Sequence, residues 1–427
     1  MKRQIFFALI LILLILPVNF AVAQEGGKFQ IGHIKIVPTV IGEAVYDNNI
    51  YKGNGKGYAA PDVTKQEAVV SDLIYHIKPS IMGSYDIPER GSISLGWQWD
   101  IARYNTETAN NWSNNSGFLN VDYAAPEGIL FGFKNAYAYS TDAYGNADQY
   151  SVGQTSQRWT DDLNTKLGYH FGSTIRSIFY YNYYIQQYEQ SKDWAQNYNQ
   201  NMFGIGFEAR FLPKTWGFVR YLYTAKTYID NDPQAQTTKS NSKANAGQIG
   251  FTWDPGAKLN GEVNFGYQWK SFDNQWVNLN NTGDQRQSSN SWSAATLVNF
   301  AALEQSIITL SISRVQRDSS SNTNEFFYDT GLGLSLSHKF FTKYTFKVGA
   351  SVASNDYNRP PVSTTTGANP PANNRNDTNW MANVGLDYKI QDWLGAGVAY
   401  AFSSKNSNYE ENNYSDNQFS FNIKLVY

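Results

Sequence analysis

The sequence contains no cysteine and carries little charge. Without cysteine, the chain cannot form a disulfide bond, a thiolate metal site or a cysteine nucleophile. Charged residues make up 16% of its 427 residues, whereas soluble domains carry roughly 25%. The formal net charge of -2 provides no basic field, so we expect no nucleic-acid partner. These absences argue against an ordinary soluble enzyme and against a nucleic-acid-binding protein.

Aromatic residues are abundant instead. The chain has 12 Trp, 30 Tyr and 25 Phe, which together form 16% of the sequence. Aromatic side chains at this density bury surface, so we predict a folded chain and not a disordered one.

The first residues have the pattern of a cleaved secretory signal peptide. Two basic residues precede an apolar run over residues 5–18, and Ala21 and Ala23 form a small-x-small cleavage site. Pro17 interrupts the run before it reaches the ~20 residues that a spanning helix needs. We therefore predict a cleaved signal peptide over residues 1–23, a short periplasmic segment over residues 24–33 and the main folded part over residues 34–427.

Beyond residue 33, the dominant pattern is alternation of apolar and polar residues. Near the carboxyl end, Phe419 and Phe421 alternate with Ser420 and Asn422. Successive side chains of a strand point to opposite faces, so this pattern predicts strands with one polar and one apolar face.

The length and spacing of these segments indicate a membrane barrel. We count about 18 segments of roughly 10–15 residues, whereas strands of soluble proteins average five or six. Short turns alternate with long polar connections such as residues 47–68 and 357–377, which is typical of outer-membrane barrels. We predict an all-β fold, a transmembrane antiparallel up-and-down β-barrel of about 18 strands in the bacterial outer membrane. Residues 24–33 are too few to form a plug domain ahead of it.

The apolar face should contact lipid, with aromatic rings at its rims. Tyr180, Tyr184 and Phe272 have the opposite phase and are candidates for ligand stacking, although filling space in the lumen is the commoner role of such rings. The aromatic residues that we assign to the outer rims are Trp97, Trp99, Trp216, Tyr221, Tyr223, Trp253, Trp269, Trp292, Trp380 and Tyr388.

The opposite face should line the lumen, with an excess of about four positive charges. Such a lining suits a hydrated channel that mildly favours anions or sugars. Alternatively, the charges pair across the wall and select nothing, and a slip of one residue in any strand would exchange its faces. The residues that we predict to line the pore are Lys78, Asp100, Lys134, Lys166, Arg176, Glu208, Arg210, Arg220, Glu262, Lys270, Lys347 and Asp387.

Catalytic and metal-binding patterns are missing from the sequence. None of the four histidines has metal-ligand spacing to another, and no G-x-S-x-G motif is present. We read His338 as a surface residue near a periplasmic turn. We therefore expect no catalytic residue, metal or cofactor, and a protein that is not an enzyme.

The carboxyl terminus resembles the signal that the barrel-assembly machinery of the outer membrane recognises. In that signal, alternating hydrophobic residues end in an aromatic carboxy-terminal residue. The matching residues are Phe419, Phe421, Ile423, Leu425 and Tyr427.

The opening of the predicted barrel has four distinctive stretches, residues 37–39, 46–51, 71–74 and 77–81. The second contains Tyr46-Asp47-Asn48, and the last two contain Ser71-Asp72 with hydrophobic residues and then Pro79. Together they resemble the first hairpin of the outer-membrane β-barrel porins found in exopolysaccharide gene clusters, in which a Tyr-Asp-Asn stretch closes the first strand and a Ser-Asp-hydrophobic run followed by proline marks the second. The resemblance implies export of polysaccharide across the outer membrane and no catalytic residues.

Three functions follow as hypotheses. The first is a passive conduit for export of polysaccharide, and the second is a general or anion-preferring porin for small solutes. The third is a closed structural or adhesive barrel that acts through its surface loops. The expected partners are outer-membrane lipid, lipopolysaccharide, the barrel-assembly machinery and periplasmic polysaccharide-export proteins.

Overall fold

A computed structural model describes most of the chain. The described residues are 29–55, 68–125, 127–142, 156–229, 241–253, 258–273, 288–319, 326–358 and 373–427. The predicted signal peptide and the first part of the predicted periplasmic segment lie outside them.

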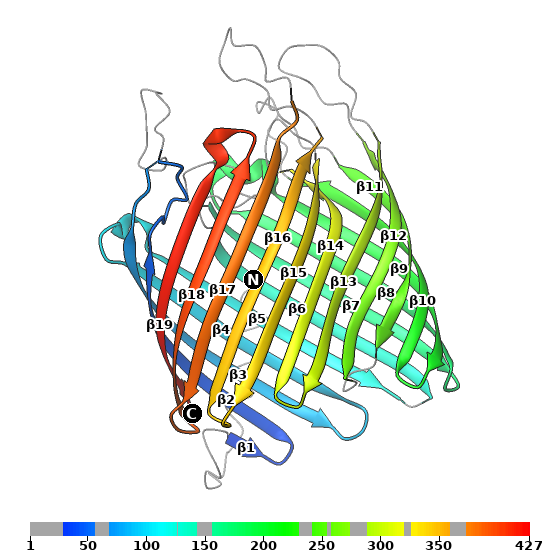
Figure 1. Ribbon diagram of the computed structural model, residues 1–427. Helices are drawn as coiled ribbons and strands as arrows, with labels where there is room; N and C mark the ends of the chain where they lie inside the picture. The colour runs from blue at the N-terminus through cyan, green and yellow to red at the C-terminus, as the bar shows by residue number, and fades with distance from the viewer. Residues whose placement is uncertain are drawn as a thin grey trace.

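The described strands form one closed antiparallel barrel (Figure 1). Each of the strands β2 to β19 pairs with its neighbour in sequence, and β19 pairs with β2 to close the ring. The predicted 18-stranded up-and-down barrel is thereby confirmed. The barrel strands are β2 (Ile34–Asp47), β3 (Asp72–Ile87), β4 (Gly91–Tyr104), β5 (Trp112–Ala124), β6 (Gly128–Asp142), β7 (Ser156–Phe171), β8 (Ile175–Tyr188), β9 (Tyr198–Leu212), β10 (Thr215–Tyr228), β11 (Ser242–Trp253), β12 (Leu259–Phe272), β13 (Ser289–Leu303), β14 (Ser306–Asp318), β15 (Phe326–Phe340), β16 (Tyr344–Tyr357), β17 (Asn376–Lys389), β18 (Leu394–Ser407) and β19 (Tyr414–Val426).

The strands are long because they must cross a bilayer while tilted. They contain between 12 residues, in β11, and 16, in β3 and β7. At about 3.3 Å per residue, even the shorter strands cover the apolar band of roughly 25 Å at the usual tilt. One additional short strand, β1 (Phe29–Ile31), pairs with the start of β2.

The connections differ at the two ends of the barrel. Turns of a few residues join the strands at the lower end in Figure 1, where the carboxyl terminus lies, and long connections extend from the upper end. Three of the upper connections contain short 3-10 helices, η2 (Thr108–Asn110), η3 (Ser191–Gln196) and η4 (Glu410–Asn412). In outer-membrane barrels, short turns are periplasmic and long loops are extracellular. None of the helices in the described residues is long and apolar enough to span a membrane.

Candidate functional site

The pairing register decides which side chains point into the barrel. Phe207 on β9 and Val219 on β10 are paired, and their side chains are 56% and 54% exposed. Large exposed apolar side chains belong on the surface that faces lipid. The next pair, Glu208 and Phe218, therefore points into the lumen. Paired residues on neighbouring strands lie on the same face, and successive residues of one strand alternate between the two faces. The pairing registers therefore assign every barrel strand an outer and an inner set of residues.

By this register, all twelve residues that the sequence predicts to line the pore lie on the inner face. They are spread around the wall and do not form one cluster. Their part in permeation is taken up below as a proposal. They are Lys78 and Asp100 on β3 and β4, Lys134 and Lys166 on β6 and β7, Arg176, Glu208, Arg210 and Arg220 on β8 to β10, Glu262 and Lys270 on β12, and Lys347 and Asp387 on β16 and β17.

On the wall formed by β2, β3 and β4, Lys78 and His76 pair with inner carboxylates. Lys78 Nζ lies 2.5 Å from Glu43 Oε2 and 3.9 Å from Asp100 Oδ2. The other oxygen of Asp100 lies 2.8 Å from His76 Nδ1. These four groups form a compact network in which no charge faces the lumen alone.

The wall formed by β8, β9 and β10 is basic and aromatic near its periplasmic end. The guanidinium groups of Arg176 and Arg210 lie 4.0 and 4.4 Å from the ring centre of Trp216, and an Arg176 nitrogen lies 2.5 Å from Glu208. Trp216 is fully buried on the inner face, so its assignment to the outer rim was wrong. The register of β9 and β10 shifts next to Trp216. Aromatic residues also occur in both phases of β10, so the positions of its aromatic residues do not show which face of the strand meets lipid.

The same network continues upward along the wall. Tyr180 Oη donates a hydrogen bond to Glu208, and the Arg220 guanidinium lies 4.6 Å from the Tyr180 ring. Arg220 also donates to both carboxylate oxygens of Glu262, at 3.2 and 3.3 Å. Such two-point contacts fix the orientation of both side chains. Arg176 and Arg220 are thus paired with carboxylates and held against the wall.

A cavity of about 780 Å³ lies above this network, in the half of the lumen near the long loops. It is lined mainly by tyrosine, amide and serine side chains. The rings of Tyr184, Tyr198 and Tyr228 follow one another at centre distances of 5.5 and 5.8 Å. Both polar side-chain atoms of Gln316 and one of Gln248 are buried without a hydrogen-bond partner in the described structure. The cavity therefore offers hydrogen-bonding groups to water or to a polar solute.

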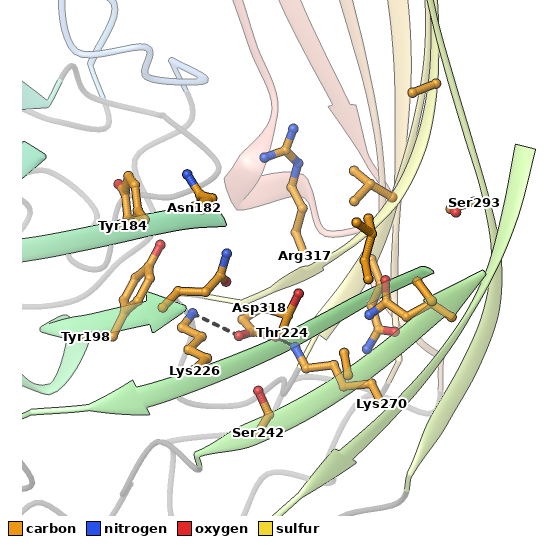
Figure 2. A pocket seen from close by; sticks show the side chains of 18 of the residues that line it. Asn182, Tyr184, Tyr198, Thr224, Lys226, Ser242, Lys270, Ser293, Arg317 and Asp318 are labelled. Atoms are coloured by element: carbon orange, nitrogen blue, oxygen red, sulfur yellow. Dashed lines mark hydrogen bonds and ion pairs between the residues drawn. The ribbon is translucent and has the colours of Figure 1, made fainter. Parts of the chain in front are cut away.

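Asp318 lies at the edge of this cavity, between two lysines (Figure 2). One carboxylate oxygen lies 2.8 Å from Lys226 Nζ, and the other is in ion-pair contact with Lys270. The side chains of these three residues are only 9–13% exposed. Asp318 is not among the residues predicted to line the pore, because its phase on β14 is that of the outer face. The sequence does contain a sign that this end of β14 does not face lipid. Ile308, Leu310 and Ile312 occupy the outer phase of the strand, but the same phase continues with the polar residues Arg314, Gln316 and Asp318.

Two further predictions concern the ends of the chain and its histidines. The five residues of the terminal signal are between 43% and 72% exposed, and those on β19 lie in its outer phase; their recognition by assembly machinery stays a prediction. His338 lies near a periplasmic turn, with Nδ1 2.7 Å from Ser306 Oγ. No group of three or more His, Asp or Glu in the described ranges could hold a metal ion.

Comparison with known proteins gives one family match. The model of the family described as "Putative beta-barrel porin 2" matches residues 134–427. The matched region does not include residues 37–81, which carry the resemblance noted in the sequence. No curated protein matches the chain.

Several solved structures are similar to this chain at low sequence identity. OpdK of Pseudomonas aeruginosa, crystallised with vanillate, has a TM-score of 0.43 and 9% identity, over 92% of this chain and 99% of that one. The siderophore receptor PirA of the same organism has a TM-score of 0.42 and 8% identity, over 92% of this chain and 80% of the receptor. A bacterial polysaccharide outer membrane secretin has a TM-score of 0.34 and 7% identity, over 92% and 98% of the two chains.

Proposed function

The chain belongs to the "Putative beta-barrel porin 2" family and is a porin-like β-barrel of the bacterial outer membrane; from this premise, we propose that it is a passive channel for hydrophilic solutes. The observation that carries the proposal is the inner face of the barrel. Its charged side chains pair with one another, and amide, hydroxyl and tyrosine groups lie between them. A wall of this kind keeps the lumen hydrated and offers many weak contacts.

The proposed solutes are rich in hydroxyl groups. Because the wall charges of the described lumen are largely paired, a neutral solute loses little by entering. Hydroxyl groups of a solute can hydrogen-bond to the amide side chains that line the cavity, and a tyrosine such as Tyr184 presents an apolar ring together with a polar group. Sugars combine both kinds of surface.

Export of polysaccharide is the finer form of this proposal. It is motivated by the opening-hairpin resemblance and by the polar lumen, and it predicts that loss of the protein leaves polymer in the periplasm. Unchanged surface polymer in a deletion strain would refute it. Periplasmic export proteins, lipopolysaccharide and the assembly machinery are the partners that this form requires.

Anion preference is the second candidate, favoured by the basic residues Lys166, Arg176, Arg210 and Arg220 on one wall. A structural or adhesive barrel is the third alternative. Its deletion test concerns residues 357–377, most of which lie outside the described residues.

The test is single-channel conductance of the refolded protein, with and without neutral and charged oligosaccharides. We expect a steady conductance that neutral oligosaccharide blocks. Replacing Tyr184 by Ala should weaken the block, whereas Tyr183→Ala, whose ring is on the outer face of β8, should not. A strong anion preference in the reversal potential, without block by neutral sugar, would favour the anion porin. Absence of conductance from a folded barrel would refute both transport proposals.

A further inference from the structure

The barrel wall is interrupted between β13 and β14. Pairing of these strands ends at Ala294 with Arg314. β13 nevertheless continues to Ser289, paired with β12, and β14 continues to Asp318, paired with β15. We call this interruption, between residues 289–293 and 315–318, the split seam.

Beyond the split seam, residues 315–318 of β14 and 326–328 of β15, which we call the hairpin end, contact the inner face of strands that do not pair with them. The Phe326 ring on β15 stacks on Phe272 of β12, with centres 6.3 Å apart and an interplanar angle of 8°. Tyr328 Oη lies 3.1 Å from Ser289 Oγ of β13. Asp318 reaches Lys226 on β10 and Lys270 on β12.

These contacts require that the hairpin end has moved into the lumen. β10 and β14 are four positions apart in the ring. At about 4.8 Å between neighbouring strands, their backbones would lie roughly 19 Å apart along a regular wall. A lysine and an aspartate side chain together reach only about 10 Å. The 2.8 Å separation of Lys226 Nζ and the Asp318 carboxylate is therefore possible only because β14 leaves the wall.

The inward position also explains the polar residues in the outer phase of β14. Gln316 and Asp318 would face lipid or solvent if β14 followed the wall. In the folded-in position, the same face of β14 lies against the inner surface of β10 to β13, where Lys226 and Lys270 lie. The ammonium group of Lys226 is also 3.6 Å from the ring centre of Tyr198, which adds a cation–π contact.

We propose that the end of the β14–β15 hairpin is the constriction of this channel and that Asp318 holds it in place by bridging Lys226 and Lys270. The inference deepens the proposed channel function and rests on it. Asp318 then sets the size of solute that passes, because without it the bridge that ties the hairpin end to Lys226 and Lys270 is lost. The hairpin end then returns toward the wall.

The test is Asp318→Asn, measured by single-channel conductance and by the entry of neutral sugars of increasing size into liposomes. We expect conductance to rise about two-fold or more, since the lumen widens at its narrowest level, and larger sugars to enter. The matched control is Asp329→Asn. It also removes one lumenal carboxylate from the hairpin, but it breaks only the pair between Arg317 and Asp329, both within the hairpin. We expect conductance of that variant to stay close to the wild-type value.

Folding of each variant is checked by the heat-dependent mobility that closed barrels show in gels. If Asp318→Asn does not assemble, the double variant Lys226→Met and Lys270→Met removes the same bridge from the other side and should give the same rise. Equal conductance and size limits in wild type, Asp318→Asn and Asp329→Asn would overturn the constriction but leave the channel intact. Silence of all folded variants would overturn the channel function itself.

Discussion

Two seams at the extracellular end of the barrel behave in opposite ways. β2 and β19 are the barrel strands most distant in sequence, and they pair up to Asp47, the last residue of β2, with Gln418. One more backbone hydrogen bond, from Asn48 to Asn417, continues the pairing beyond it. β13 and β14 follow each other in sequence, and they separate at Ala294 and Arg314. Closeness in sequence therefore does not decide which strand ends stay together.

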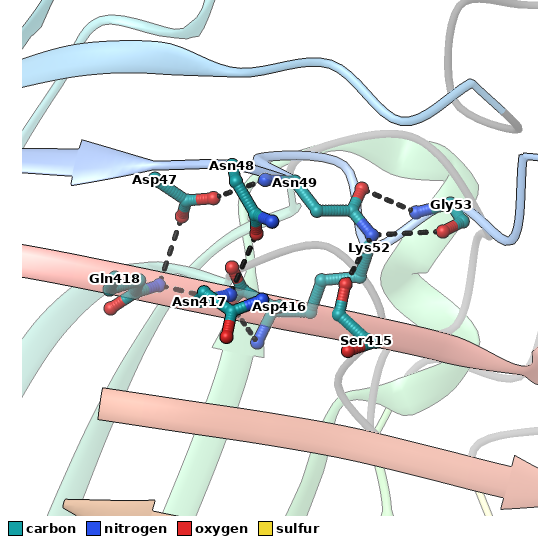
Figure 3. Close-up of polar contacts among 9 residues, drawn as sticks. All are labelled: Asp47, Asn48, Asn49, Lys52, Gly53, Ser415, Asp416, Asn417 and Gln418. Atoms are coloured by element: carbon teal, nitrogen blue, oxygen red, sulfur yellow. Dashed lines mark hydrogen bonds and ion pairs between the residues drawn. The ribbon is translucent and has the colours of Figure 1, made fainter. Parts of the chain in front are cut away.

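The seam between β2 and β19, which we call the closing seam, is held by side chains just beyond the strand ends (Figure 3). Asn49 is fully buried, and its Nδ2 donates to the carbonyl oxygens of Gly53 and Ser415, both at 2.9 Å. Gln418 Nε2 donates to the carboxylates of Asp47 and Asp416. Polar groups of the two strands thus satisfy each other across the seam.

At the split seam, the side chains find their partners elsewhere. Asp318 contacts Lys226 and Lys270, and Phe326 stacks on Phe272. A strand end therefore stays in the wall where its polar groups form hydrogen bonds across the seam. It leaves the wall where charged residues of more distant strands are the better partners.

The largest effect is expected from cysteine pairs introduced between β13 and β14, one pair where the strands are paired and one pair within the split seam. The chain has no native cysteine that could compete in cross-linking. Ala295 and Ser313 are paired on the inner face, so cysteines there should form a disulfide on mild oxidation. Ser291 and Arg317 would be paired if the register continued beyond the split seam. Cysteines there should stay reduced in the folded barrel. Efficient cross-linking of the second pair, measured by gel mobility without reductant, would mean that the seam is closed in the membrane.

The next largest effect is expected at the closing seam. Asn49→Ala removes the hydrogen bonds to Gly53 and Ser415 and leaves buried backbone groups unsatisfied, which should cost about 2–4 kcal/mol of unfolding free energy. The measurement is urea unfolding in lipid vesicles. The control is Asn54→Ala, at a residue whose side-chain bond to the Glu410 carbonyl is exposed, and its cost should stay below about 1 kcal/mol. Equal costs for both would show that Asn49 does not hold this seam.

A smaller effect is expected from the aromatic contact inside the lumen. Phe326→Ala removes the ring that stacks on Phe272 and should weaken hairpin docking by about 1 kcal/mol. Single-channel records should then show more frequent excursions to a higher conductance. Phe340→Ala is the control, since that ring stacks on Tyr344 at the periplasmic end of the same strand. An equal increase in both variants would count against a docking role for Phe326.

The smallest effect is expected from one hydroxyl group. Tyr328→Phe removes the hydrogen bond with Ser289 Oγ and should cost about 0.5–1.5 kcal/mol. Ser289→Ala should cost a similar amount, and the double variant should cost little more than either alone. Fully additive unfolding free energies would mean that this bond across the split seam is not formed.

Much of this architecture could be predicted from the sequence. The strand number, the alternation of short turns and long connections and the face of residues such as Glu208 and Arg220 follow from the period of two. That pattern is local, since each strand records in its own residues which of its sides meets lipid. The pairing of Glu208 with Arg176, and of Arg220 with Glu262, could not be predicted, because the partners come from different strands.

At two positions, the phase of a residue within its own strand predicts the wrong face. Trp216 is apolar and at a strand end, so it was assigned to the lipid rim, but Arg176 and Arg210 cover its ring in the lumen. Asp318 has the outer phase, yet it lies inside the barrel. In both cases, the deciding contacts are made by residues of other strands.

The sequence by itself determined that the chain is a barrel of about 18 strands and which side of nearly every strand faces water. Each strand gains free energy by removing its own apolar side chains from water, so the alternation within a single strand shows which of its faces is apolar. Only the tertiary structure decided where the wall splits and which charges meet across the lumen. Ring closure places β10, β12 and β14 around one lumen, and Asp318 contacts Lys226 and Lys270 only because the end of β14 leaves the wall and enters that lumen.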